Sequence, residues 1–235
     1  MHIPDGILPA TVCVAGYALT TGATSYSLRK INEREDPLEG VPKAALLAAV
    51  FFVASWIHVP VPPTSVHLML IGLMGVVLGY YAFPAILIGL FFQAVMFQHG
   101  GLSTLGVNAM LFGVPALVAY QLFRLHTAVG KGANRPGIIG VFGFVAGFTG
   151  VAFAALLTVG VLLSGIPTYL DVGAERAAIL AIVLVHVPLM FIEGIMTAFV
   201  VIFLQRVKPE VLEERVWDKT AADISEHSVS VAVKG

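Results

Sequence analysis

The sequence predicts an all-α membrane protein, a polytopic bundle of about seven transmembrane helices with its N-terminus outside and its C-terminus inside. Hydrophobic residues make up 58% of the chain, charged residues make up 11%, and the mean hydropathy is +0.92. Soluble globular domains carry about 25% charged residues. The net charge of −1 provides no basic field for nucleic acid. The composition therefore places the chain in a lipid bilayer.

The apolar residues gather in long runs, and about 20 apolar residues are needed for a helix to cross the hydrocarbon core. The first run is rich in Thr and Ser, which indicates contact with protein more than with lipid. The fourth is short and follows the third closely, and the last is long enough to tilt or protrude. The seven expected spans are residues 9–28, 44–61, 66–83, 84–98, 107–123, 138–164 and 178–205.

The orientation follows from the distribution of Lys and Arg, which are concentrated in the cytoplasmic loops of membrane proteins. If the N-terminus lies outside and the spans alternate, twelve of the thirteen basic residues fall on the cytoplasmic side. Only Arg176 falls outside. An odd number of spans follows, with residues 206–235 as a short cytoplasmic tail.

The first two residues, Met1 and His2, have distinctive metal chemistry. The α-amine of Met1, the amide nitrogen of His2 and its imidazole Nδ1 can close two fused chelate rings around one ion. One further imidazole completes a square-planar nitrogen site, a geometry that suits Ni(II), Cu(II) or planar Co(II) and disfavours zinc. A histidine at position two also occurs by accident, so the rest of the chain has to support a metal site.

Four of the seven histidines are expected at one outer membrane face: His2, His58, His67 and His99. Converging imidazoles are what an external metal receptor needs. Three prolines in residues 59–66 stiffen the approach to His67 and make it a good fourth ligand. The alternatives are ordinary interfacial histidines and a rigid interhelical turn.

Residues 98–108 are polar and glycine-rich although they lie between hydrophobic spans. Irregular backbone at membrane depth is tolerated when it is buried in protein or lines a cavity. Four side chains of this segment are candidates for orienting the metal ligands: Gln98, His99, Ser103 and Asn108. An exposed outer loop is the alternative.

Two ionisable residues, His186 and Glu193, share one face of the last span, where such residues indicate function by default. A transfer path, a structural polar contact and an interhelical tether are all open, and we favour a structural contact. The chain has no phosphate-binding loop, serine elbow or zinc-protease motif, so no ATP is expected on it and it is not expected to be an enzyme.

Residues 1–6, the Pro-rich segment before His67 and residues 100–108 resemble the CbiM/NikM family, the substrate-binding membrane components of energy-coupling factor (ECF) transporters for cobalt and nickel. The resemblance covers residues 1–205. It implies a seven-helix metal-binding bundle over residues 1–205, in which residues 1–8 fold back as the chelating segment. Met1, His2 and His67 would then bind the ion, and residues 98–108 would close over the site.

The resemblance also implies partners in a prokaryotic inner membrane: a membrane coupling subunit, two cytoplasmic ATPase subunits and a separate small two-span accessory protein. The chain is thus expected to capture Co(II) or Ni(II) as a transported substrate, with a link to cobalamin biosynthesis. Which metal it takes stays open. The alternatives are a self-sufficient proton-coupled metal permease, with His186 and Glu193 as its relay, and a membrane-embedded metalloenzyme.

Overall fold

The structure, a computed structural model, describes residues 2–61, 64–130, 135–164 and 172–212, and this part of the chain is helical apart from one short β-hairpin. The all-α prediction is confirmed. Three 3₁₀ turns supplement the helices, at Gly79–Tyr81, Leu125–Val129 and Pro209–Val211. The main elements are α1 (Ala10–Asn32), α2 (Val41–Ala54), β1 (His58–Val61), β2 (Thr64–His67), α3 (Ile71–Leu78), α4 (Ala82–Phe97), α5 (Leu105–Arg124), α6 (Pro136–Ser164) and α7 (Val172–Val207).

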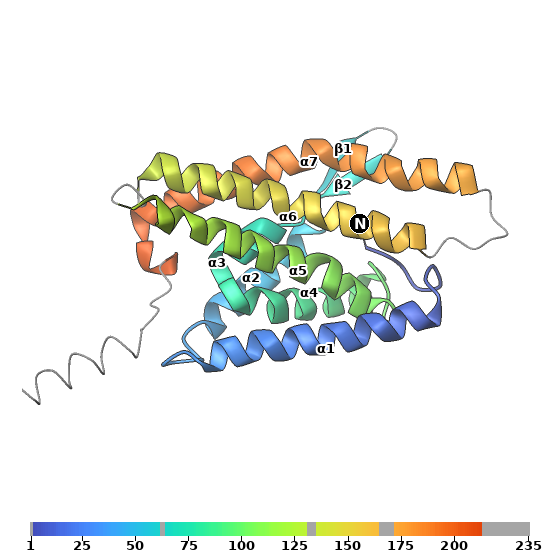
Figure 1. The fold of residues 1–235 in the computed structure, drawn as a ribbon, viewed down its shortest axis with the longest axis horizontal. Helices are drawn as coiled ribbons and strands as arrows, with labels where there is room; N and C mark the ends of the chain where they lie inside the picture. The colour runs from blue at the N-terminus through green and yellow to red at the C-terminus, as the bar shows by residue number, and fades with distance from the viewer. Residues whose placement is uncertain (1, 62–63, 131–134, 165–171, 213–235) are drawn as a thin grey trace, which may run out of the picture.

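Helix α5 lies at the centre of the bundle and packs against α1, α3, α4 and α6, while α7 packs along α6 (Figure 1). Its buried positions include Leu111, Phe112 and Ala116. Small residues allow the helices to approach closely, as is common in membrane bundles. A Cβ added to Gly72 of α3 would overlap the backbone of Gly147 in α6. The core therefore depends on glycine where α3 meets α6.

The third and fourth apolar runs form a helical hairpin, α3 and α4, rather than two full-length spans. Helix α3 has 8 residues, or about 12 Å, which is less than half of the hydrocarbon core. Gly79 ends it with φ 57° and ψ −126°, a conformation that glycine adopts without the steric cost of a Cβ. Helix α4 then returns, so that the residues before α3 and after α4 meet.

The second run also ends earlier than expected, at Ala54, and prolines from residue 60 onward exclude a helix in the segment that follows. Strand β1 pairs with β2 in antiparallel register, with His58 opposite His67 and Val61 opposite Thr64. The expected rigid turn is thus a β-hairpin, and β2 ends at His67. This hairpin lies beside α7 (Figure 1).

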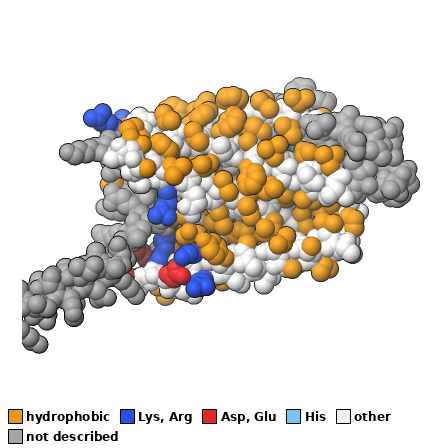
Figure 2. Space-filling model, in the orientation of Figure 1, with side chains coloured by type: hydrophobic (Ala, Val, Ile, Leu, Met, Phe, Trp, Pro, Cys, Tyr) orange, Lys and Arg blue, Asp and Glu red, His pale blue; other side chains and the backbone are white. Residues whose placement is uncertain are grey.

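The outer surface of the described bundle suits a membrane. By length and composition alone, four stretches among the described residues are long and apolar enough to cross one: Ile71–Phe97, which folds back between α3 and α4, Leu105–Val129, Pro136–Ser164 and Val183–Val207. Figure 2 shows hydrophobic side chains over most of one face, with Lys and Arg gathered toward one end. Large exposed hydrophobic residues include Leu19, Phe91, Leu156 and Phe199. The chain is a multi-pass membrane protein.

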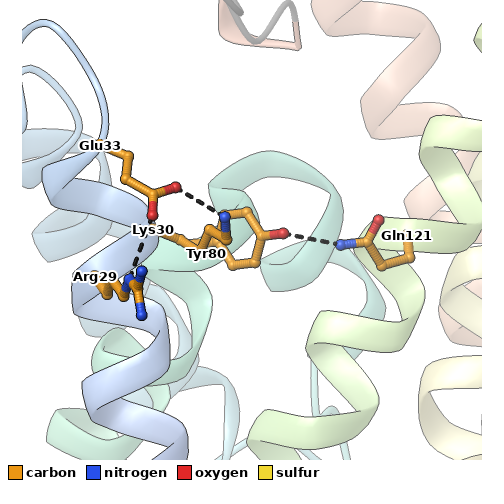
Figure 3. A network of polar contacts seen from close by, with 5 residues as sticks. All are labelled: Arg29, Lys30, Glu33, Tyr80 and Gln121. Atoms are coloured by element: carbon orange, nitrogen blue, oxygen red, sulfur yellow. Dashed lines mark hydrogen bonds and ion pairs between the residues drawn. The ribbon is translucent and has the colours of Figure 1, made fainter.

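Two sets of polar contacts lie near the Gly79–Tyr81 turn, one at the end of α1 and one between this turn and α5 (Figure 3). Glu33 accepts a hydrogen bond from Lys30 at 2.8 Å and pairs with Arg29 at 3.5 Å. The Gln121 amide donates to the Tyr80 hydroxyl at 3.3 Å. These contacts are exposed, so each contributes little to stability. They lie at the C-terminal end of α1, whereas the histidines predicted as ligands lie toward its N-terminal end.

Candidate metal centre

Three imidazoles meet at one point of the bundle. Each of His2, His67 and His99 offers a ring nitrogen, and the three nitrogens all lie within 4.8 Å of one another. The Nε2 atoms of His67 and His99 are 3.3 Å apart. The ring of His2 lies with its centroid 5.2 Å from that of His67 and 4.3 Å from that of His99. Three of the four histidines predicted at one face therefore converge, and the fourth, His58, lies opposite His67 in the hairpin.

His67 ends β2, and its ring has a defined tautomer. Its Nδ1 lies 3.1 Å from the carbonyl oxygen of Leu68. Since a carbonyl oxygen can only accept, Nδ1 carries the ring proton and Nε2 presents a lone pair. That lone pair faces the other two imidazoles, which is the arrangement a metal ligand requires.

His99 follows the end of α4. Gln98 closes the helix in a left-handed conformation, with φ 53°, and the His99 amide donates to the Gln93 carbonyl at 3.1 Å. This turn directs His99 toward β2. Gln98 itself is exposed, so of the two neighbouring residues it is His99 that the structure brings to the cluster.

The N-terminal segment is held to the start of α5 by its backbone. Ile3 donates its amide to Asn108 Oδ1 at 2.9 Å, and its carbonyl accepts from Asn108 Nδ2 at 3.0 Å. The Thr104 hydroxyl also donates to that carbonyl, at 2.7 Å. The Ile3 side chain is 3% exposed. These contacts place His2 over Phe112, with ring centroids 4.7 Å apart.

Asp5 forms a second attachment, nearer the surface. Its carboxylate accepts from the Ser103 hydroxyl at 2.5 Å, the Ser103 amide at 2.9 Å and the Leu102 amide at 3.2 Å. Hydrogen bonds from Ser103 are the main cause that lowers the pKa of Asp5 below its usual 3.8. The carboxylate also faces the N-terminus of α5, where negative charge is favourable. A Cβ on Gly101 would overlap Asp5, so this contact requires glycine.

The ring of His2 lies beside the rings of His67, His99 and Phe112. Both ring nitrogens are buried, and neither has a hydrogen-bond partner among the described residues. Burial lowers the pKa of His2 well below 6.5, His99 and His67 add to the shift, and the nearby Gln93 carboxamide opposes it. This shift favours the neutral imidazole, which is the form that binds a metal ion.

The other candidates take different places. Ser103 and Asn108 hold the N-terminal segment, as the orienting role predicted for them requires, whereas Met1 lies outside the described residues. His186 is buried within α7. Glu193 makes a structural polar contact, as favoured, but with the backbone amides of Met69 and Leu70.

Gln93 was missed by the sequence reasoning. It is 0% exposed and lies near His2. Its amide nitrogen is 3.4 Å from the Phe51 carbonyl, to which it donates. A polar residue in the interior of the apolar run 84–98 was the signal available for it, because a buried carboxamide needs partners.

Asn108→Ala is expected to release the N-terminal segment. The buried Ile3 amide would lose its acceptor, at a cost of about 1–3 kcal/mol. We expect a lower melting temperature and faster hydrogen exchange at residues 2–6. Thr158→Ala is the matched control, because the buried Thr158 hydroxyl donates only within α6, to the Ala154 carbonyl at 2.8 Å. Unchanged exchange at residues 2–6 in Asn108→Ala would contradict this account of how the segment is held.

Comparison with known proteins gives consistent matches over nearly the whole chain. Residues 2–211 match the family CbiM, described as a cobalt uptake substrate-specific transmembrane region. The chain is 35% identical over 213 residues to a putative metal transport protein of Haemophilus influenzae, covering 90% of this chain and 97% of that protein. It is 33% identical to the fused nickel transport protein NikMN of Rhodobacter capsulatus, covering 92% of this chain but 65% of that longer protein. A crystal structure of a transition metal transporter superposes with a TM-score of 0.75 at 26% identity, covering 95% of this chain and 99% of the other.

Proposed function

This chain belongs to the CbiM family of cobalt and nickel transport proteins, and from that membership we propose that it is the substrate-capture component of an ATP-driven ECF-type importer. The observation that carries the proposal is the cluster of His2, His67 and His99, whose ring nitrogens lie within 4.8 Å of one another. The N-terminal segment is held there by Asn108, as a receptor with a folded-back terminus requires.

The proposed ligands are four nitrogens in a square plane. Three come from the start of the chain: the Met1 amine, the His2 amide nitrogen and His2 Nδ1. The fourth is His67 Nε2, whose lone pair is left available because Nδ1 donates to Leu68. Such a planar nitrogen set suits Ni(II) or Co(II), the transported substrate. His99, whose Nε2 lies 3.3 Å from that of His67, would orient the ligands.

The proposed partners are those that the resemblance to the ECF transporters implies. The sequence has no phosphate-binding loop, so ATP hydrolysis belongs to two cytoplasmic ATPase subunits, joined through a membrane coupling subunit. A separate two-span accessory protein completes the complex. The N-terminus and the histidine cluster face outward, so the ion is captured outside and released inward, across the inner membrane.

Metal titration of the purified protein tests the capture role. We expect one Ni(II) or Co(II) per chain by calorimetry, a visible d–d band typical of planar nitrogen coordination, and proton release on binding. Because the amine and the amide must lose protons, affinity should fall steeply as the pH is lowered. Absence of binding by the wild-type protein would refute the capture role.

Uptake measurements separate the importer from the permease. In cells that express the whole set of subunits, metal uptake should stop when the ATPase subunits are removed. Reconstituted vesicles with this chain alone should not accumulate metal in response to a proton gradient. Gradient-driven accumulation by the chain alone would instead establish the secondary permease.

A further inference from the structure

We propose that Glu193 is a positioning residue for the metal ligand His67, acting through the peptide group between Leu68 and Met69. The inference rests on the proposed function, since it assigns a residue to the same site. It concerns a carboxylate in the middle of α7, more than 120 residues along the chain from the hairpin that carries His67.

Glu193 is 0% exposed and faces the start of α3. Its Oε1 accepts hydrogen bonds from the amides of Met69 and Leu70, the latter at 2.8 Å. The first amides of a helix have no partner within the helix, and α3 has no cap of its own, because its N-cap residue Leu70 makes no side-chain cap bond. The carboxylate of a distant helix therefore supplies the cap.

The cap also fixes an unfavourable backbone conformation. Leu70 has φ 53° and ψ 16°, the left-handed region, which is sterically unfavourable for a non-glycine residue. Such a conformation persists only where its surroundings determine it. The two hydrogen bonds to Glu193 hold the residues on both sides of the Met69–Leu70 peptide and so keep the chain in this turn.

The connection to His67 runs through one peptide unit. The Leu68 carbonyl, which accepts from His67 Nδ1 at 3.1 Å, and the Met69 amide, which donates to Glu193, belong to the same planar group. Fixing one end of this plane fixes the other. The carboxylate also polarises the peptide and strengthens its carbonyl as an acceptor. Glu193 thereby holds the ring proton on Nδ1 and leaves Nε2 to the metal ion.

This arrangement extends a common device of metal sites, in which a histidine ligand donates its other ring nitrogen to a carboxylate or a carbonyl group. Loss of such a partner typically weakens metal binding 10–100-fold. Here the Leu68 carbonyl is the direct partner of His67, and the Glu193 carboxylate binds the amide of the same peptide group. We expect removal of the carboxylate to weaken binding toward the lower end of that range, about 10-fold.

The test compares Ni(II) binding and the d–d band of Glu193→Met, Glu193→Gln and the control Thr197→Val. Methionine keeps the length of the side chain without an acceptor, whereas glutamine keeps an acceptor oxygen. We expect about 10-fold weaker binding and a shifted band for Glu193→Met, and near wild-type values for Glu193→Gln. Thr197 is also buried, one turn along α7, and its hydroxyl has no partner among the described residues, so Thr197→Val should bind normally.

A double-mutant cycle with His67→Ala shows whether the effect passes through His67. In that background Glu193→Met should cause no further loss, because the ligand that it positions is gone. An equal loss in both backgrounds, or wild-type binding by Glu193→Met, would overturn the inference. If the wild-type protein bound no metal, the proposed function would fail, which is a separate result.

A second pair of variants covers the case in which Glu193→Met does not fold. Glu193→Asp is shorter by one methylene and withdraws the acceptor from the two amides, whereas Glu193→Gln leaves an acceptor in place. We expect Glu193→Asp to bind Ni(II) more weakly than Glu193→Gln. Equal binding by the two would also overturn the inference.

Discussion

Extending the chain by two residues ahead of Met1 is expected to abolish high-affinity Ni(II) and Co(II) binding. The extension turns the Met1 amine into a peptide nitrogen and removes one ligand of the proposed square plane. The first chelate ring is lost with it, so the loss should exceed the 10–100-fold typical of an orienting residue. Calorimetry and the planar d–d band would measure it.

The extension should leave the rest of the N-terminal segment in place. Ile3 would keep its bonds to Asn108 and Thr104, and Asp5 would keep its bonds to Ser103. The metal-free melting temperature should therefore be unchanged, and this distinguishes loss of a ligand from loss of docking. The same two residues added at the C-terminus are the matched control. Full affinity in the extended protein would move the site to the internal histidines alone.

His67→Ala is expected to have an effect of similar size. It removes the fourth nitrogen of the proposed square plane, and the three donors of the N-terminus cannot supply a fourth ligand. We expect at least 100-fold weaker binding, beyond the range typical of an orienting residue, and His99→Ala should be milder. His126→Ala is the control, because its ring contacts the Phe123 carbonyl at 2.7 Å, outside the cluster. If His99→Ala abolished binding while His67→Ala retained it, the assignment of the fourth ligand would be reversed.

Much of the site was predictable because topology alone brings its residues together. Hydrophobic runs and basic loops place His2, His67 and His99 at one face, and in the structure their ring nitrogens meet. The polar segment 98–108 was also expected to close over the site. The pairing of Asn108 with the Ile3 backbone could not be predicted. Every non-proline residue has the same backbone amide and carbonyl, so the side chain of residue 3 gives no sign that its backbone binds Asn108.

The differences in the fold have two causes. Span lengths were estimated from hydropathy. Hydropathy gives no information on backbone angles, so it could not show that Gly79, with φ 57°, reverses the chain between α3 and α4. The hairpin at residues 58–67 was expected as a rigid turn, since prolines exclude helix but do not specify pairing. The role of Glu193 was left open because its partners are backbone amides 123 and 124 residues away, and any helix start could have supplied them.

The order in which the chain is synthesised determines when the N-terminal segment can attach to the bundle. The Asn108 partner of Ile3 emerges 105 residues later, roughly 5–20 s at ordinary translation rates. Glu193, which we assign to the support of His67, is made later still, in the last helix. The first residues to leave the ribosome thus have no Asn108 partner until nearly half of the chain has been made. A nascent chain that lacks α7 has no carboxylate at the start of α3, so on our proposal it would bind the metal ion more weakly than the completed protein.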